Sequence, residues 1–228
     1  MDDVQKFYVI MENLEKRLMG KRILDKCDGR MSWPRRGVYF FFEESENRTH
    51  SGKGLRAVRI GTHALEEKSK TSLWERLRQH KGTLNGKHPG GGNHRESVFR
   101  KHVGSAIINK RGMNCISWGE KRISKKERDL EYELEKKVSQ YIRKMPFIWL
   151  KIDDEPGPNS MRAFLERNAI ALLSNLNKNP IDPPSENWLG NNSKNERVVR
   201  SGLWKDKHTE RAPDPRFLDI FDKFVMRM

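Results

Sequence analysis

Tyr39 lies in an apolar run, GVYFFFEE, that has the composition of a β-strand. Strand alternation places Tyr39 and Phe41 on one face, and Val38, Phe40 and Phe42 on the other. A strand that is apolar on both faces is typical of the covered centre of a sheet. A free phenol has a pKa of about 10, so it accepts a proton near neutrality only beside positive charge. Tyr39 is therefore either a core aromatic or a phenol presented for proton transfer.

Three other side chains have types that could take part in a reaction. Arg76 and His80, in LWERLRQH, are four residues apart and share one face of the expected helix. A guanidinium binds phosphate through a planar fork of donors, and an imidazole exchanges protons near neutral pH. Glu166, in AFLERNAIALL, offers a carboxylate from a later helix. The alternatives are a solvated helix face for Arg76 and His80, and an ion pair between Glu166 and Arg162 one turn earlier.

The first half of the chain predicts the elements that would position Tyr39, Arg76 and His80. A helical stripe begins at residue 3, and we expect an N-terminal helix over residues 3–26. RRGVYFFFEE and LRAVRIG read as two strands joined by a long polar loop, which predicts a hairpin. TSLWERLRQHKG then predicts a short helix, capped by Thr71 or Ser72 and ended by Gly82.

The second half predicts mainly helices and one further strand. SVFRKHVGSAII reads as a helix, and residues 125–145 as one charged amphipathic helix whose apolar stripe includes Leu130. PFIWLKIDD reads as the third strand, and NSMRAFLERNAIALLSNLN as the helix that carries Glu166. An ordered, Pro-rich and Asn-rich segment and a last short helix, RFLDIFDKFVM, make up a C-terminal extension over residues 179–228. The expected fold is α+β: a single domain with a small three-stranded antiparallel sheet flanked by helices.

The charge of the chain predicts a polyanionic partner. Among its 228 residues, 46 Lys and Arg outnumber 31 Asp and Glu, which gives a net charge of +15. The basic residues are spread over the chain, so a folded basic surface and a nucleic acid, DNA or RNA, are expected. No apolar run approaches the length of a membrane span, and two cysteines, Cys27 and Cys115, give no disulfide framework. We expect an intracellular, cytoplasmic protein without membrane contact.

The motifs and their order resemble the GIY-YIG nuclease family over residues 36–175. GVY stands for the first motif of the family and RIG for the second. LWERLRQH is similar to the helix with the arginine and the histidine, and AFLERNAIALL to the helix with the metal-binding glutamate. Each motif alone is weak, but four in the right order on the right elements are specific. The resemblance implies an endonuclease that hydrolyses DNA phosphodiester bonds.

The resemblance also implies a role for each residue. Tyr39 would be the general base that takes a proton from the attacking water, and His80 would hydrogen-bond the tyrosine, the water or the phosphate. Arg76 would clamp the scissile phosphate. Glu166 would hold one Mg²⁺ or Mn²⁺, with waters and phosphate oxygens as the other ligands. The alternative is a GIY-YIG-like module that binds nucleic acid without cutting it.

The chain departs from the family pattern at Arg59, where the second motif normally has a tyrosine. Alternation places Val58 and Ile60 on one face of that strand and Arg59 on the other. If Arg59 shares the face of Tyr39, its charge would favour the ionised phenol and contact phosphate. His63, two residues beyond the motif, is a second candidate to assist Tyr39.

Two further predictions concern loops. The family tends to place an asparagine beyond the glutamate, and here we expect Asn187, in PPSENWLG, to fill that place. The glycine-rich segment TLNGKHPGGGNHRE lacks the Gly-Lys-Ser/Thr ending of a phosphate-binding P-loop. Asn93, His94 and Arg95 are expected to contact DNA near a helix N-terminus, unless the segment is a plain connector. Trp188 and Trp204 either stack on unpaired bases or cover the core.

Overall fold

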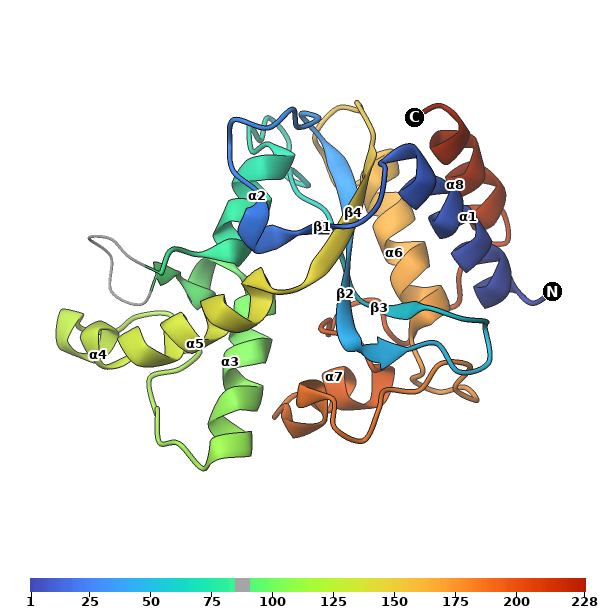
Figure 1. Ribbon diagram of the computed structural model, residues 1–228. Helices are drawn as coiled ribbons and strands as arrows, with labels where there is room; N and C mark the ends of the chain where they lie inside the picture. The colour runs from blue at the N-terminus through green and yellow to red at the C-terminus, as the bar shows by residue number, and fades with distance from the viewer. Residues whose placement is uncertain (85–90) are drawn as a thin grey trace.

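An antiparallel sheet with helices on both faces forms the protein (Figure 1). The computed structural model describes residues 1–84 and 91–228. The strand order is β1-β4-β2-β3. The helices are α1 (Asp3–Arg17), α2 (Leu73–Lys81), α3 (Val98–Arg111), α4 (Lys125–Leu130), α5 (Tyr132–Arg143), α6 (Met161–Leu173), α7 (Glu196–Ser201) and α8 (Phe217–Met226), and the strands are β1 (Arg22–Ile23), β2 (Gly37–Asn47), β3 (Leu55–Gly61) and β4 (Pro146–Lys151).

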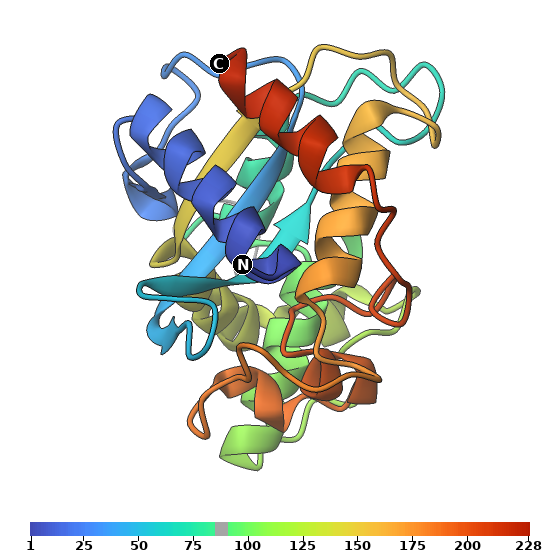
Figure 2. The same ribbon diagram turned by 90° about the vertical axis from the view of Figure 1, so that its right-hand side faces the viewer.

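Two hydrophobic clusters lie on opposite faces of the sheet. Helices α1, α6 and α8 cover one face, and α2, α3 and α5 cover the other, as Figures 1 and 2 show. The central strand β2 pairs with both β3 and β4. Its side chains alternate as expected: Phe40 packs in the first cluster, whereas Tyr39 and Phe41 pack in the second. The expected α+β class is confirmed.

The sheet has one strand more than the three expected, because β1 lies where the N-terminal helix was predicted to continue. Helix α1 ends at Arg17, not at residue 26. Met19 has a φ of 58° and the amide of Gly20 donates to the carbonyl of Glu15, which is the hydrogen bond of a left-handed helix end. The chain then adds the two-residue strand β1 to the edge of β4. Two residues are too few for a sequence pattern to reveal.

A bulge in β3 changes which side chains reach the face of Tyr39. Phe41 pairs with Arg59 and Phe42 with Ala57, so Val58 is an extra residue in the ladder. Val58 therefore packs in the cluster of Tyr39, and Ile60 packs in the opposite one. The predicted alternation, with Val58 and Ile60 on one face, is wrong. Arg59 pairs with Phe41 and so lies on the face of Tyr39.

The charged helix predicted over residues 125–145 is divided at Glu131. Glu131 turns inward, where its carboxylate accepts hydrogen bonds from Arg95 and from the Ser117 hydroxyl. Leu130, expected in the apolar stripe, is consequently 74% exposed. The following helix α5 packs on the protein through Leu134, as predicted.

The C-terminal segment runs beside β3 and returns to the first cluster with α8. The amide of Trp204 donates to the carbonyl of Val58 at 2.7 Å. Trp188 and Trp204 are both buried, and the indole N–H groups of both donate to Glu43. These two tryptophans cover the core and are not available to stack on bases. In the described part of the chain, no helix is long and apolar enough to cross a membrane.

Candidate active site

The phenol of Tyr39 and the imidazole of His80 meet between β2 and α2. The Tyr39 hydroxyl lies 2.7 Å from Nε2 of His80, and both side chains are fully buried. Gly61 pairs with Tyr39 across the sheet. A Cβ at Gly61 would lie 2.6 Å from Cε2 of the Tyr39 ring and closer still to the hydroxyl. The glycine of the second motif therefore makes the space that the phenol occupies.

His80 is held in its neutral form. Its Nδ1 lies 2.8 Å from the hydroxyl of Ser97, which also caps α3 by accepting from the amide of Arg100. Burial lowers the pKa of His80 well below its usual value, and the charge of Arg76 lowers it further. A neutral imidazole has one donor and one acceptor nitrogen. When Nδ1 donates to Ser97, Nε2 is left to accept the proton of the Tyr39 phenol.

Arg76 lies one helical turn before His80 and is half-buried. Its Nη1 donates to Oε1 of Gln79 at 2.8 Å and to the carbonyl of Glu96 at 2.9 Å. Within the described residues, its Nη2 and Nε make no hydrogen bond. The guanidinium is thus anchored through one nitrogen and has donors left for an anion.

Arg59 is buried on the face of Tyr39, as the bulge of β3 requires. Its guanidinium carbon lies 5.3 Å from the centre of the Phe99 ring, and its Nη1 donates to the carbonyl of Trp204. Its Nε is buried without a hydrogen-bond partner among the described residues. The charge of Arg59 also lowers the pKa of His80, so this arginine is close enough to act electrostatically on the imidazole.

His63 does not hydrogen-bond Tyr39 in the structure, where His80 has that position. Its Nδ1 donates to the carbonyl of Thr71 at 2.9 Å, and its Nε2 is buried without a partner in the described part of the chain. Burial lowers the pKa of His63 to about 4, and the charges of Arg162 and Arg76 act in the same direction. His63 is therefore a neutral, buried imidazole near the arginines.

Glu166 on α6 is buried, and its Oε1 lies 2.9 Å from Nζ of Lys205. Burial alone would raise the pKa of Glu166, but the charge and hydrogen bond of Lys205, together with the charge of Arg59, outweigh burial and the net shift is downward. The carboxylate is thus ionised. The expected alternative, a pair with Arg162, is wrong, because the guanidinium of Arg162 binds Asp154 and the carbonyls of His63 and Glu155.

The site has one carboxylate that fits a divalent metal. No group of three or more His, Cys, Asp or Glu side chains that could hold a metal occurs within residues 1–84 and 91–228. The Lys205 ammonium nevertheless shows that the environment of Glu166 accepts a cation. Mg²⁺ commonly takes one or two carboxylates and completes its octahedron with waters and phosphate oxygens. Glu166 fits that role once a phosphate is present.

Asn93, His94 and Arg95 all form hydrogen bonds with other residues of the protein, and only His94 of the three is buried. His94 is buried, stacks on Trp118 with ring centres 3.8 Å apart, and bonds Glu135 through Nδ1. Arg95 makes a two-pronged pair with Glu131. Asn93 accepts from the amide of Arg95. Their contact with DNA stays a prediction, and residues 85–90 of the predicted loop lie outside the described residues.

Asn187 is exposed, and its side chain makes no hydrogen bond to any described residue. Its predicted role is untested. Sequence reasoning missed Ser97 and Lys205. Ser97 had a signal, since a serine directly before a helical pattern predicts an N-cap. Lys205 had none, because only the path of the C-terminal segment along β3 brings it to Glu166.

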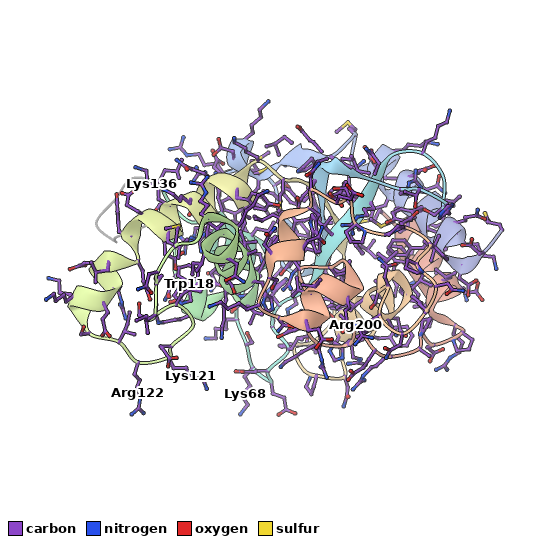
Figure 3. All side chains as sticks on the ribbon, turned by 90° about the horizontal axis from the view of Figure 1, so that it is seen from below. Lys68, Trp118, Lys121, Arg122, Lys136 and Arg200 are labelled. Carbon is purple, nitrogen blue, oxygen red and sulfur yellow. The ribbon has the colours of Figure 1, made fainter. Side chains whose placement is uncertain are left out.

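Three exposed basic side chains lie on one side of the protein. Lys68, Lys121 and Arg122 project to the same side in Figure 3. Lys68 comes from the loop between β3 and α2, and the other two from the segment between α3 and α4.

A model of the GIY-YIG domain matches the chain over residues 1–228. Neither the curated proteins nor the solved structures contain a match to it. The domain is a nuclease-type fold. Gly37 and Gly61 lie on the paired strands β2 and β3. With the match over its full length, the chain belongs to the GIY-YIG domain family.

Proposed function

We propose that the protein is a metal-dependent endonuclease that hydrolyses DNA phosphodiester bonds. The observation that carries this proposal is the hydrogen bond of 2.7 Å between Tyr39 and His80, opposite a glycine that leaves room for the phenol. Arg76 on the same helix as His80, and Glu166 on α6, supply the phosphate clamp and the metal ligand. The net charge of +15 favours a nucleic-acid substrate.

In the proposed reaction, Tyr39 receives the proton of the attacking water while its own proton passes to Nε2 of His80. The water oxygen bonds to phosphorus, and the bond from phosphorus to the leaving oxygen breaks. The leaving oxygen takes the electron pair of that bond and is protonated by solvent water. The charge of Arg76 stabilises the phosphate oxygens. Bound phosphate offsets the positive charges around His80, which raises the pKa of this imidazole toward its usual value and makes it a better proton acceptor. A divalent metal on Glu166 would act as a Lewis acid toward the leaving oxygen.

We also propose that the protein is located in the cytoplasm. Cys27 and Cys115 are both free thiols. Free thiols are typical of a reducing compartment, which supports a cytoplasmic protein.

Two observations favour a second candidate, a GIY-YIG domain that binds nucleic acid without cutting it. Tyr39 has no exposed surface, and Lys205 is bound to Glu166 where a metal would bind. If neither group is released by substrate, the site holds phosphate but does not activate water.

A cleavage assay separates the two candidates. The protein is incubated with supercoiled plasmid and with labelled single-stranded and double-stranded DNA and RNA, in Mg²⁺, Mn²⁺ or EDTA. Tyr39→Phe and Glu166→Gln are the matched variants. Strand scission that needs metal and is lost in both variants supports the endonuclease. Salt-sensitive binding without scission supports the binding module, and scission that survives both variants contradicts the assigned site.

A further inference from the structure

Lys205 reaches Glu166 from a segment with a fixed path. Leu203 and Trp204 are buried, and the amide of Trp204 donates to the carbonyl of Val58 at 2.7 Å. Nε1 of Trp204 donates to Oε1 of Glu43 at 2.7 Å, and the carbonyl of Trp204 accepts from Arg59. Both the amide and the carbonyl of Trp204 are thus hydrogen-bonded, and these two bonds fix the position of the backbone next to Lys205.

The pair that Lys205 makes is desolvated. The side chains of Lys205 and Glu166 are 13% and 6% exposed, with 2.9 Å between Nζ and Oε1. An ion pair in such surroundings is screened little by salt, and removal of one partner leaves a charge without compensation. Arg59 and His208 also lie close enough to act on Glu166. In the protein without bound metal, the Glu166 carboxylate is therefore already paired with the Lys205 ammonium.

A divalent cation that binds Glu166 in the absence of nucleic acid must displace the ammonium or lie beside it. Displacement leaves Lys205 buried without a partner, and coexistence places a double positive charge near Lys205 and Arg59. A phosphodiester removes both costs, because its oxygens give the ammonium a new partner and give the metal further ligands.

We propose that Lys205 keeps divalent metal off Glu166 until a phosphodiester enters, so that metal and nucleic acid bind this site together. The inference rests on the proposed role of Glu166 as metal ligand. A phosphodiester oxygen must pair with the Lys205 ammonium before the metal can bind Glu166. Because binding linkage is reciprocal, the metal raises the affinity for nucleic acid by the factor by which nucleic acid raises the affinity for metal.

Mn²⁺ binding to the DNA-free protein tests the inference without relying on cleavage. The free Mn²⁺ signal in electron paramagnetic resonance is measured for the wild-type protein and for Lys205→Met, Lys205→Gln and Lys205→Arg. Thermal melts check that each variant folds. We expect Lys205→Met and Lys205→Gln to bind one Mn²⁺ at least about tenfold more tightly than the wild type, a difference of about 1.4 kcal/mol. Lys205→Arg keeps the cation and should bind like the wild type.

The double variant Lys205→Met/Glu166→Gln assigns the bound ion, because the added Mn²⁺ site must disappear with the carboxylate. Equal Mn²⁺ affinity in the wild type and in the two neutral variants would overturn the inference, and so would failure of all of them to bind.

A second measurement uses Tyr39→Phe, which keeps Glu166 and Lys205 and prevents the proposed reaction. Its affinity for a labelled duplex should rise at least about tenfold with Mn²⁺, and this gain should be absent when Glu166→Gln is added. An unchanged affinity would overturn the inference. Failure of the proposed nuclease function appears separately, as absence of plasmid scission in any metal.

Discussion

The hydroxyl of Ser97 lies 2.8 Å from Nδ1 of His80, so the residue that caps α3 also orients the imidazole beside Tyr39. One side chain thereby joins the start of a helix to the proposed proton path. Because Nδ1 contacts Ser97, Nε2 of His80 is the ring nitrogen that faces the phenol.

Ser97→Ala should reduce cleavage at least about tenfold, because the imidazole loses the hydrogen bond that holds its orientation. It should also cost about 1 kcal/mol of stability through the lost helix cap. Ser124→Ala is the control, since Ser124 caps α4 with a side-chain hydrogen bond and none of its hydrogen bonds reaches the described residues of the site. Cleavage kinetics and thermal melts measure both effects. Equal cleavage by the two variants would contradict the role of Ser97.

Gly61→Ala should displace the Tyr39 ring and destabilise the protein by about 1–3 kcal/mol, the usual cost of overpacking a core. Cleavage should be lost as the phenol moves from His80. The double variant Gly61→Ala/Tyr39→Ala tests the cause, because removal of the ring leaves room for the added methyl group. In that background Gly61→Ala should cost less than about 1 kcal/mol. Denaturant unfolding of the wild type, the two single variants and the double variant gives the coupling free energy between the two positions. If the two costs in stability add, overlap with the Tyr39 ring is not the reason for the glycine.

The stability of the protein should fall with pH below about 6.5 because of His63. The unfolded chain binds a proton at this imidazole near its usual pKa, whereas burial lowers the pKa in the folded protein to about 4. The stabilising effect is therefore fully present above the unfolded pKa and declines as pH falls toward the folded one. Between about pH 6.5 and pH 5 the loss is about 2 kcal/mol.

His63→Gln should remove that part of the pH dependence, as measured by urea unfolding at both pH values. His50→Gln, at an exposed histidine, is the control and should leave the dependence unchanged. His80, whose pKa is lowered by burial and by Arg76, acts in the same direction and contributes to the dependence that remains. A pH profile that is the same in His63→Gln and the wild type would contradict this assignment.

Arg59→Ala should lower cleavage at least about tenfold, because the guanidinium lies on the face of Tyr39 and holds the carbonyl next to Lys205. Arg59→Lys keeps the charge without the planar fork and should retain more activity than Arg59→Ala. Cleavage rates under identical metal and salt conditions compare the three proteins. Unchanged cleavage by Arg59→Ala would show that this arginine has a packing role alone.

Local sequence patterns predicted most of the helices and strands. The features that these patterns did not predict depend on contacts between residues far apart in the sequence. The alternation around Tyr39 and the helical spacing of Arg76 and His80 led to the elements that bring Tyr39 and His80 together, and the structure shows their hydrogen bond. Their catalytic roles stay predictions. The bulge at Val58 was missed because an extra residue in a ladder depends on the partner strand. Arg162 was the partner considered for Glu166 in the alternative interpretation, since nothing local indicates that Lys205 lies beside it.

The tie between Trp204 and Val58 has a consequence for the order in which the molecule acquires its parts. A chain made from its N-terminus presents the Tyr39 strand, the His80 helix and the Glu166 helix well before residue 205 leaves the ribosome. Until that moment Glu166 lacks its ammonium, and Arg59 lacks the carbonyl to which it donates. A nascent chain, or one truncated before Trp204, would thus expose an uncompensated carboxylate to free metal ions. When the C-terminal segment packs along β3, Lys205 pairs with Glu166 and the site is complete.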